Sequence, residues 1–236
     1  MILTVIQARR GGTRLPGKIN MDLGDGASML SHVVHRVSLI GLPFVIAYPP
    51  PDLKESDVLG RFVRIARRNP EVDAFVRITA DCPLLDPSVA GYVVNTYRGG
   101  STELVGTTPE MDGLDVECFS RAALLACDLA AHGRDREHVT RWMRKNLRTQ
   151  TVNWAPAPLR WSVDDWAGLA FVRTVYAACD LCKRGVPHHT NASGSIGGAD
   201  RTLVVDVHHV ADGGLAECTA ADLLKTRMGG AVYVSK

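Results

Sequence analysis

The chain has 236 residues, of which 46% are hydrophobic, and its formal net charge at pH 7 is only +2. A charge so close to zero argues against bulk attraction to nucleic acid or to an anionic membrane surface, so we expect neither as a partner. The apolar run Met1 to Ile6 is too short for a signal peptide, no stretch approaches the roughly 20 residues of a membrane span, and the six cysteines are scattered. These features predict a cytoplasmic protein with reduced thiols.

Hydrophobic runs and amphipathic segments alternate along the chain, which predicts strands and helices in turn. Strands are expected at residues 2–7, 44–48, 74–79, 102–106, 114–119, 149–153 and 160–163. Helices are expected after the cap Ser28, over 57–69, from Asp86-Pro87, after the cap Ser120, over 135–147 and over 165–183. In the helix at 57–69, Val58, Phe62 and Ile65 should face inward and Arg61, Arg64 and Arg68 outward.

This alternation predicts an α/β fold, with a mostly parallel sheet covered by helices on both faces in three layers. We assign residues 1–184 to one domain. The composition of "TNASGSIGGADR", residues 190–201, indicates a linker. Residues 185–236 are therefore predicted to be a linker and a C-terminal appendage.

The first strand runs directly into a loop, in "VIQARRGGTRLPGK", residues 5–18. In an open parallel sheet, ligands bind beyond the carboxyl ends of the strands. Gly11 and Gly12 would let a ligand approach the main chain, and Arg9, Arg10, Arg14 and Lys18 would supply positive charge for a polyphosphate. A plain glycine turn with solvated arginines is the alternative.

Two aspartates follow extended segments, Asp81 in "ITADCP" and Asp164 in "RWSVDD". Carboxylates that meet at strand ends can hold one Mg²⁺, which takes its other oxygens from water and phosphate. Each could instead be a helix cap or a turn residue, and Asp165 is the substitute ligand if Asp164 is a cap.

A second acidic stretch, "DGLDVE", places Asp115 and Glu117 on one face of an extended segment by strand alternation. These carboxylates could bond the hydroxyls of an acceptor or help to deprotonate one. In "REHVT", Arg136 could hold an acceptor's carboxylate and His138 could hydrogen-bond it. An exposed edge strand and a solvated helix start are the alternatives, and Arg77 is expected to be an interior charge partner.

Six blocks occur in the order found in the CMP-sugar synthetases, the acylneuraminate and CMP-KDO cytidylyltransferases, and especially in their spore-coat-polysaccharide branch. They are "VIQARRGGTRLPGKINMDL", "DVLGRF", "VRITADCPLLDP", "DGLDVECFS", "REHVT" and "RWSVDD", and the resemblance covers most of residues 1–182. It implies a nucleotide-diphospho-sugar transferase fold, usually dimeric, with CTP as substrate and Mg²⁺ as cofactor.

The resemblance also implies roles for individual residues. The catalytic residues would be Arg14, Lys18, Asp81 and Asp164, of which the two aspartates would be the metal ligands. The nucleotide would be bound by Ala8, Arg9, Gly11, Gly12, Arg14, Lys18, Thr79 and Ala80. The acceptor, a sugar acid or related acid, would contact Asp115, Glu117, Arg136 and His138.

The sequence departs from the family in one place, since residues 48–57 join the second strand directly to "DVLGRF" where relatives have a further helix and strand. The alternatives are therefore another nucleotidyltransferase or glycosyltransferase of this fold, or a nucleotide-binding protein without turnover. Cys179 and Cys182, followed by His188 and His189, could form a zinc site, although packing at a helix end is the expected role of the cysteines.

Overall fold

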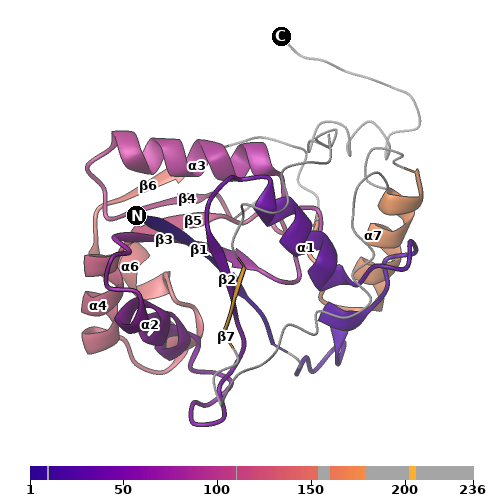
Figure 1. Cartoon of the computed structure of the whole chain (residues 1–236), viewed down its shortest axis with the longest axis horizontal. Coiled ribbons are helices and arrows are strands. Elements are labelled where there is room, and N and C mark those ends of the chain that lie inside the picture. Colours follow the sequence, from indigo (N-terminus) through magenta and orange to yellow (C-terminus); the bar gives the residue numbers. More distant parts are fainter. Residues whose placement is uncertain (10, 110, 154–159, 179–201, 206–236) are drawn as a thin grey trace.

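The computed structural model describes residues 1–9, 11–109, 111–153, 160–178 and 202–205. Their strands form one seven-stranded sheet in the order β6-β4-β5-β3-β1-β2-β7 (Figure 1). The strands are β1 (Ile2–Gln7), β2 (Phe44–Ala47), β3 (Ala74–Thr79), β4 (Leu104–Thr107), β5 (Glu117–Ser120), β6 (Thr149–Val152) and β7 (Thr202–Val205).

The sheet is mostly parallel, as predicted. β1 pairs in parallel with β2 and β3, and β4 pairs in parallel with β6. β5 lies antiparallel between β3 and β4, and β7 runs antiparallel along β2. Because β1, β2 and β3 point the same way, the segments that follow them all leave from one edge of the sheet.

Helices cover both faces of this sheet, which confirms the three-layer architecture (Figure 1). They are α1 (Met29–Ser38), α2 (Val58–Arg68), α3 (Pro87–Gly99), α4 (Arg121–Ala130), α5 (Arg134–Glu137), α6 (Arg141–Asn146), α7 (Trp166–Ala178) and the 3₁₀ helix η1 (Lys18–Asn20). The core on one face joins α2, α4 and α6 to the sheet, as with Phe62 and Phe119. The other core joins α1 and α3, as with Val33 and Val93.

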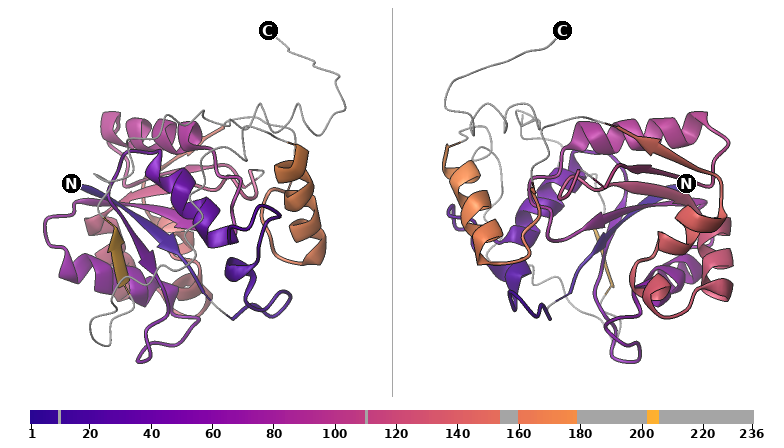
Figure 2. Two further views of the ribbon diagram at one scale, coloured as in Figure 1. Left: turned by 45° about the vertical axis from the view of Figure 1, so that its right-hand side comes forward. Right: turned by 180° about the vertical axis from the view of Figure 1, so that it is seen from behind.

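A third apolar cluster lies beyond the sheet edge, where α7 packs against the loop that follows β1 (Figure 2). Leu15 and Leu23 from the loop meet Leu169 and Val172 from α7. Arg173 of α7 also donates two hydrogen bonds to the carbonyl oxygen of Asp22, at 2.8 and 3.0 Å. The chain after residue 160 therefore supports the loop that leaves β1.

The predicted helix caps are confirmed. Ser28, Asp86 and Ser120 each accept a hydrogen bond from a backbone N–H in the first turn of the helix that follows. Such a bond satisfies an N–H that has no partner within the helix, and it contributes about 1 kcal/mol. Pro87 follows Asp86 in the first turn, where its missing N–H has no cost.

Three local predictions are wrong. Arg61 does not face outward: it is 2% exposed, beneath the loop that leaves β1, and donates to the carbonyl of Ala8. Residues 160–163 form no strand, because their backbone bonds to the loops at Asp81 and Asp112. The helix expected over 135–147 is two short helices, since the backbone at His138 leaves the helical region.

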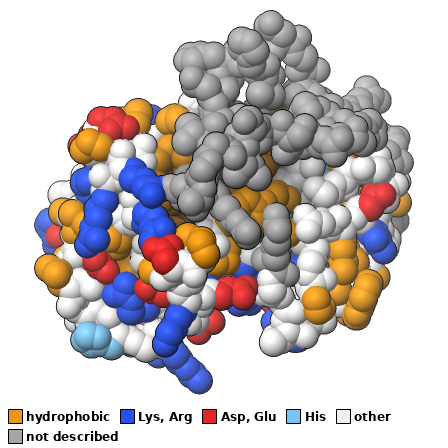
Figure 3. All heavy atoms as spheres, turned by 60° about the horizontal axis from the view of Figure 1, so that its bottom comes forward, with side chains coloured by type: hydrophobic (Ala, Val, Ile, Leu, Met, Phe, Trp, Pro, Cys, Tyr) orange, Lys and Arg blue, Asp and Glu red, His pale blue; other side chains and the backbone are white. Residues whose placement is uncertain are grey.

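Charged side chains of both signs share the surface. The outward-facing Arg64 pairs with Asp52, and Arg148 lies 3.5 Å from Glu103. Figure 3 shows Lys and Arg interspersed with Asp and Glu on one face.

No helix of the described residues is long and apolar enough to cross a membrane. The possible zinc ligands, the linker and most of the C-terminal tail lie outside the described residues.

Candidate active site

The centre of the site is the ammonium group of Lys18. Gly17 before it has a φ of 68°, a conformation that favours glycine, and there the chain turns into η1. The Lys18 side chain is only 7% exposed. Its Nζ donates to Asp81 Oδ2 at 2.7 Å, to the carbonyl of Val163 at 2.7 Å and to Asp164 Oδ1 at 3.1 Å. One buried cation thus joins three segments that are far apart in the sequence.

Asp81 and Asp164 converge because the backbone holds their segments together. The N–H of Val163 donates to the carbonyl of Asp81 at 2.8 Å. Arg14 lies 3.1 Å from Asp164, and Arg160 also pairs with it. Burial alone would raise the pKa of Asp164, but Lys18, Arg14 and Arg160 outweigh burial and bring that pKa below its ordinary value.

The acidic loop before β5 packs against the same segment. Gly113 has a φ of 89°, and a Cβ there would lie 2.2 Å from the nitrogen of Ser162, so only glycine fits. The N–H of Trp161 donates to the carbonyl of Asp112 at 2.8 Å, and Arg160 pairs with the Asp112 carboxylate at 3.0 Å. Arg160 thus links Asp112 to Asp164, a role that the sequence did not indicate, because a spacing of four residues brings side chains together only in a helix.

The half-buried Asp115 lies in this loop, and its pKa is raised above the ordinary value. Its Oδ2 accepts a hydrogen bond from the N–H of Gly113 at 3.1 Å. Burial raises the pKa of Asp115 to about 6, and the nearby Asp112 adds to the rise. A carboxyl with such a pKa can take up a proton near neutral pH.

The two aspartates fit a divalent ion. Their side chains are 28% and 25% exposed and share Lys18, so a ligand can reach both. Within the described residues there is no group of three or more His, Cys, Asp or Glu side chains that could hold a metal. This donor set suits Mg²⁺, which is held by one or two carboxylates and keeps water or phosphate as its other ligands.

The loop that is predicted to bind the nucleotide follows β1, but its two glycines do not adopt the expected conformation. Neither Gly11 nor Gly12 has a positive φ. A Cβ at Gly12 would lie 2.8 Å from the carbonyl oxygen of Leu15, and a Cβ at Gly11 would lie 2.8 Å from the carboxylate of Glu55. The exposed Arg9 borders the loop, whereas the main chain of Ala8 is already hydrogen-bonded on both sides.

Thr79 and Ala80 complete this edge at the end of β3. The N–H of Ala80 donates to the carbonyl of Gln7 at 3.0 Å, and Ala80 is 2% exposed. Thr79 Oγ1 lies 2.9 Å from Cys82 Sγ. Both residues therefore lie beside the end of β1, where the nucleotide loop begins.

Glu117 is the centre of a separate, buried cluster. Its side chain is 8% exposed and accepts from Arg77 at 2.7 Å, from Thr140 at 2.6 Å and from Arg144 at 2.8 Å. The guanidinium group of Arg144 lies against Gly106, so a Cβ at this position would clash with it. Burial would raise the pKa of Glu117, but the two arginines lower it below its ordinary value. Arg77 is thus the interior charge partner that was predicted.

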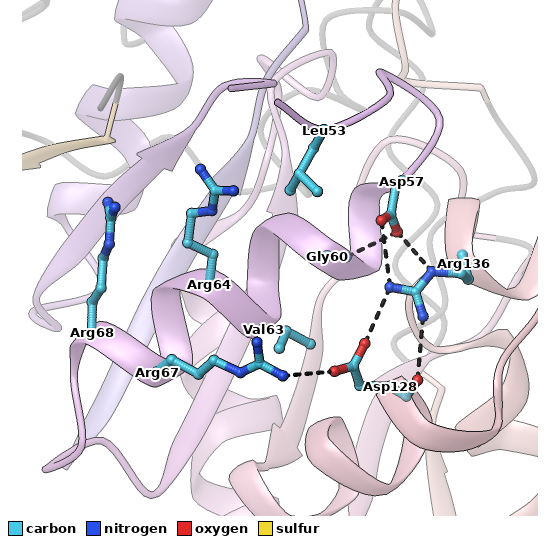
Figure 4. Close-up of a pocket in the computed structure, with 9 residues that line it drawn as sticks. All are labelled: Leu53, Asp57, Gly60, Val63, Arg64, Arg67, Arg68, Asp128 and Arg136. Atoms are coloured by element: carbon cyan, nitrogen blue, oxygen red, sulfur yellow. Dashed lines mark hydrogen bonds and ion pairs between the residues drawn. The ribbon is translucent and has the colours of Figure 1, made fainter. Parts of the chain in front are cut away.

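Arg136 and His138 lie in different surroundings. Arg136 bonds Asp57 at 2.9 Å and Asp128 at 3.1 Å, so it joins α5 to the start of α2 and the end of α4 (Figure 4). His138 instead lines a cavity of about 480 Å³ together with Arg77, Thr140, Arg141, Arg144 and Lys145. The structure therefore groups Arg14, Lys18, Asp81 and Asp164, and it separates Arg136 from His138.

Comparisons with known proteins agree with the motifs. No family model matches the sequence. The chain is 27% identical to the spore coat polysaccharide biosynthesis protein SpsF of Bacillus subtilis over 186 residues, which cover 67% of this chain and 76% of SpsF.

Solved structures share the fold. A cytidylyltransferase from Leptospira borgpetersenii matches with a TM-score of 0.67 at 20% identity, covering 78% of this chain and 90% of its own. A CMP-2-keto-3-deoxy-manno-octonic acid synthetase complexed with CTP matches with a TM-score of 0.60 at 17% identity, covering 75% and 98%. Rv0371c of Mycobacterium tuberculosis in complex with manganese matches with a TM-score of 0.54 at 14% identity, covering 72% and 97%.

These matches confirm the nucleotide-diphospho-sugar transferase fold. The sequence relative agrees with the resemblance of the motifs to the CMP-sugar synthetase family and to its spore-coat-polysaccharide branch.

Proposed function

We propose that the protein is a cytidylyltransferase that moves CMP from CTP to a hydroxyl of a sugar acid or related acid and releases pyrophosphate. The observation that carries this proposal is the convergence of Lys18, Asp81 and Asp164 beyond the carboxyl ends of β1 and β3. The family and the CTP and manganese complexes of the two structural neighbours support a nucleotide and a divalent ion here.

In the proposed reaction, the acceptor's hydroxyl oxygen forms a bond to the α-phosphorus of CTP. The bond from that phosphorus to the bridging oxygen breaks, and pyrophosphate leaves with the electron pair. Lys18 and Arg14 hold phosphate oxygens and offset their charge, so catalysis is mainly positioning and electrostatic stabilisation. Magnesium held by Asp81 and Asp164 would supply further charge neutralisation on the triphosphate.

The proton of the attacking hydroxyl needs an acceptor, and Asp115 suits this role. Its pKa of about 6 leaves it mostly ionised at neutral pH yet more basic than an ordinary aspartate. Asp115 lies in the loop that packs on the segment of Asp164. The charge of Arg77 acts to lower the pKa of Asp115 and so favours its ionised form.

An acidic acceptor fits the cavity lined by His138. Four of its lining residues are cationic, namely Arg77, Arg141, Arg144 and Lys145. Glu117 offsets Arg77 and Arg144, while Asp135 lies 3.0 Å from Arg141 and 3.7 Å from Lys145. Four cations facing two carboxylates leave an excess of positive charge, which favours an anion such as the carboxylate of a sugar acid.

The test is pyrophosphate release by the purified protein with each of four NTPs, Mg²⁺ or Mn²⁺, and a panel of sugar acids. Release is expected with CTP and an acidic sugar, and much less with the neutral sugar of the same skeleton. Stabilisation by CTP in thermal unfolding without pyrophosphate from any acceptor would instead identify a nucleotide-binding protein without turnover.

The homodimer remains a prediction, which light scattering of the purified chain would check.

A further inference from the structure

The short connector at residues 48–57 lies against the nucleotide loop. It joins β2 to α2 and contains neither a helix nor a strand. A Cβ built on Gly11 would lie 2.8 Å from each carboxylate oxygen of Glu55, so this carboxylate rests directly on the main chain of the loop. The departure from the family pattern has therefore placed an acidic side chain beside the nucleotide site.

The buried Arg61 fixes this arrangement. Its Nη1 donates to the carbonyl of Ala8 at 3.3 Å, and its Nη2 donates to the carbonyl of Glu55. One guanidinium thus joins the start of the nucleotide loop to the connector. Burial lowers the pKa of Arg61, and the charge of Glu55 opposes this shift only in part.

The main chain of Ala8 already has partners within the protein. The N–H of Ala8 donates to the carbonyl of Ala47 at 3.1 Å, and its own carbonyl accepts from Arg61. The Ala8 N–H is therefore not available to a base, and the Ala8 carbonyl has one acceptor site left. A side chain held beside the loop can add to what the main chain offers, and the Glu55 carboxylate is held there.

We infer that the Glu55 carboxylate accepts a hydrogen bond from the exocyclic amino group of cytosine and so selects CTP over UTP. This inference rests on the proposed function. An ionised carboxylate can only accept hydrogen bonds. Cytosine presents a donor at C4, whereas uracil presents an acceptor oxygen there, which would oppose the carboxylate and leave both groups unsatisfied.

The test is equilibrium titration of CTP and of UTP, each with Mg²⁺ and without an acceptor, into the wild-type protein and Glu55→Gln. The wild-type protein is expected to bind CTP about tenfold or more tightly than UTP, as unmatched polar groups cost at least that much. Glu55→Gln should bring this ratio close to one, because a carboxamide can turn to donate to uracil or accept from cytosine.

Asp52→Asn is the matched control, since Asp52 lies on the same connector and pairs outward with Arg64. This variant removes the same charge and should keep the wild-type ratio. The inference is overturned if Glu55→Gln keeps the ratio, or if both variants strengthen CTP and UTP equally, which would show charge repulsion alone.

The titration also separates this inference from the function on which it rests. A wild-type protein that binds CTP and UTP equally would overturn the role of Glu55 and leave nucleotidyl transfer standing. A wild-type protein that binds neither nucleotide would overturn both. Glu55 is exposed, so Glu55→Gln should keep the wild-type melting temperature, which thermal unfolding verifies.

Discussion

Two clusters of carboxylates and cations lie near the same end of the sheet, and they differ in what they leave available. At Lys18, two aspartates that are 28% and 25% exposed share one buried ammonium. At Glu117, a carboxylate that is 8% exposed receives two arginines and a hydroxyl. The first cluster has oxygens that a ligand can reach, whereas the carboxylate of the second has its hydrogen-bonding capacity used within the protein.

The comparison shows that residue type alone does not identify a reactive carboxylate. Asp81 and Glu117 both face a cation on a neighbouring segment. Exposure and unused acceptor capacity distinguish them, because removal of one partner from a buried, fully paired carboxylate leaves the remaining charges uncompensated at a large cost in free energy. We therefore expect substitutions at the first cluster to affect activity and substitutions at the second to affect stability.

The largest effect is expected from Asp81→Asn. Loss of this charge should lower the turnover number by about 10³, the scale found for a group that stabilises transition-state charge. The amide oxygen can still accept from Lys18, so the melting temperature should change little. Pyrophosphate release and thermal unfolding measure the two effects, with the exposed Asp73→Asn as control. A fully active Asp81→Asn would refute the assignment.

The next largest effect is the loss of stability expected from Glu117→Gln in the second cluster. Glu117→Gln leaves Arg77 and Arg144 without their counter-charge and should lower the free energy of unfolding by about 2–4 kcal/mol, less than for a fully buried pair because Arg144 is partly exposed. Denaturant unfolding measures this loss. Glu103→Gln removes only the surface pair with Arg148 and should cost under about 1 kcal/mol. Equal losses in the two variants would contradict the distinction.

The smallest change in stability concerns Asp115, whose pKa of about 6 in the folded protein exceeds the ordinary 3.8. Between these values the folded state binds more protons than the unfolded state, so stability falls as the pH rises through that window. Asp115→Asn should therefore stabilise the fold above pH 6, by about 1–2 kcal/mol after allowance for partial exposure, with the difference shrinking toward pH 4.

The same substitution tests the catalytic role of Asp115. Wild-type turnover should rise with pH around a midpoint near the pKa of about 6, because only the ionised carboxyl can accept the proton. Asp115→Asn should lose this rise along with most of the activity. Stabilisation without any change in the pH profile of turnover would leave Asp115 a buried carboxyl with no part in proton transfer.

Local sequence signals are sufficient to predict the order and kind of most elements. Strands such as Phe44–Ala47 are continuous apolar runs, and helices begin at caps such as Ser120 followed by apolar residues at helical spacing. These are local signals, since each depends on neighbours within one or two turns. The position of Arg61 could also have been predicted, because Val58, Arg61, Phe62 and Ile65 lie on one helical stripe.

Which charged groups meet depends on the packing of distant segments. Lys18, Asp81 and Asp164 are brought together by η1 and by the bond from Val163 to the carbonyl of Asp81. Likewise, nothing near Glu55 in the sequence indicates that it rests on Gly11. Such contacts depend on how distant segments pack, and local periodicity carries no information about that packing. Exposure, which separates the open Asp81 from the closed Glu117, is also a property of the assembled fold.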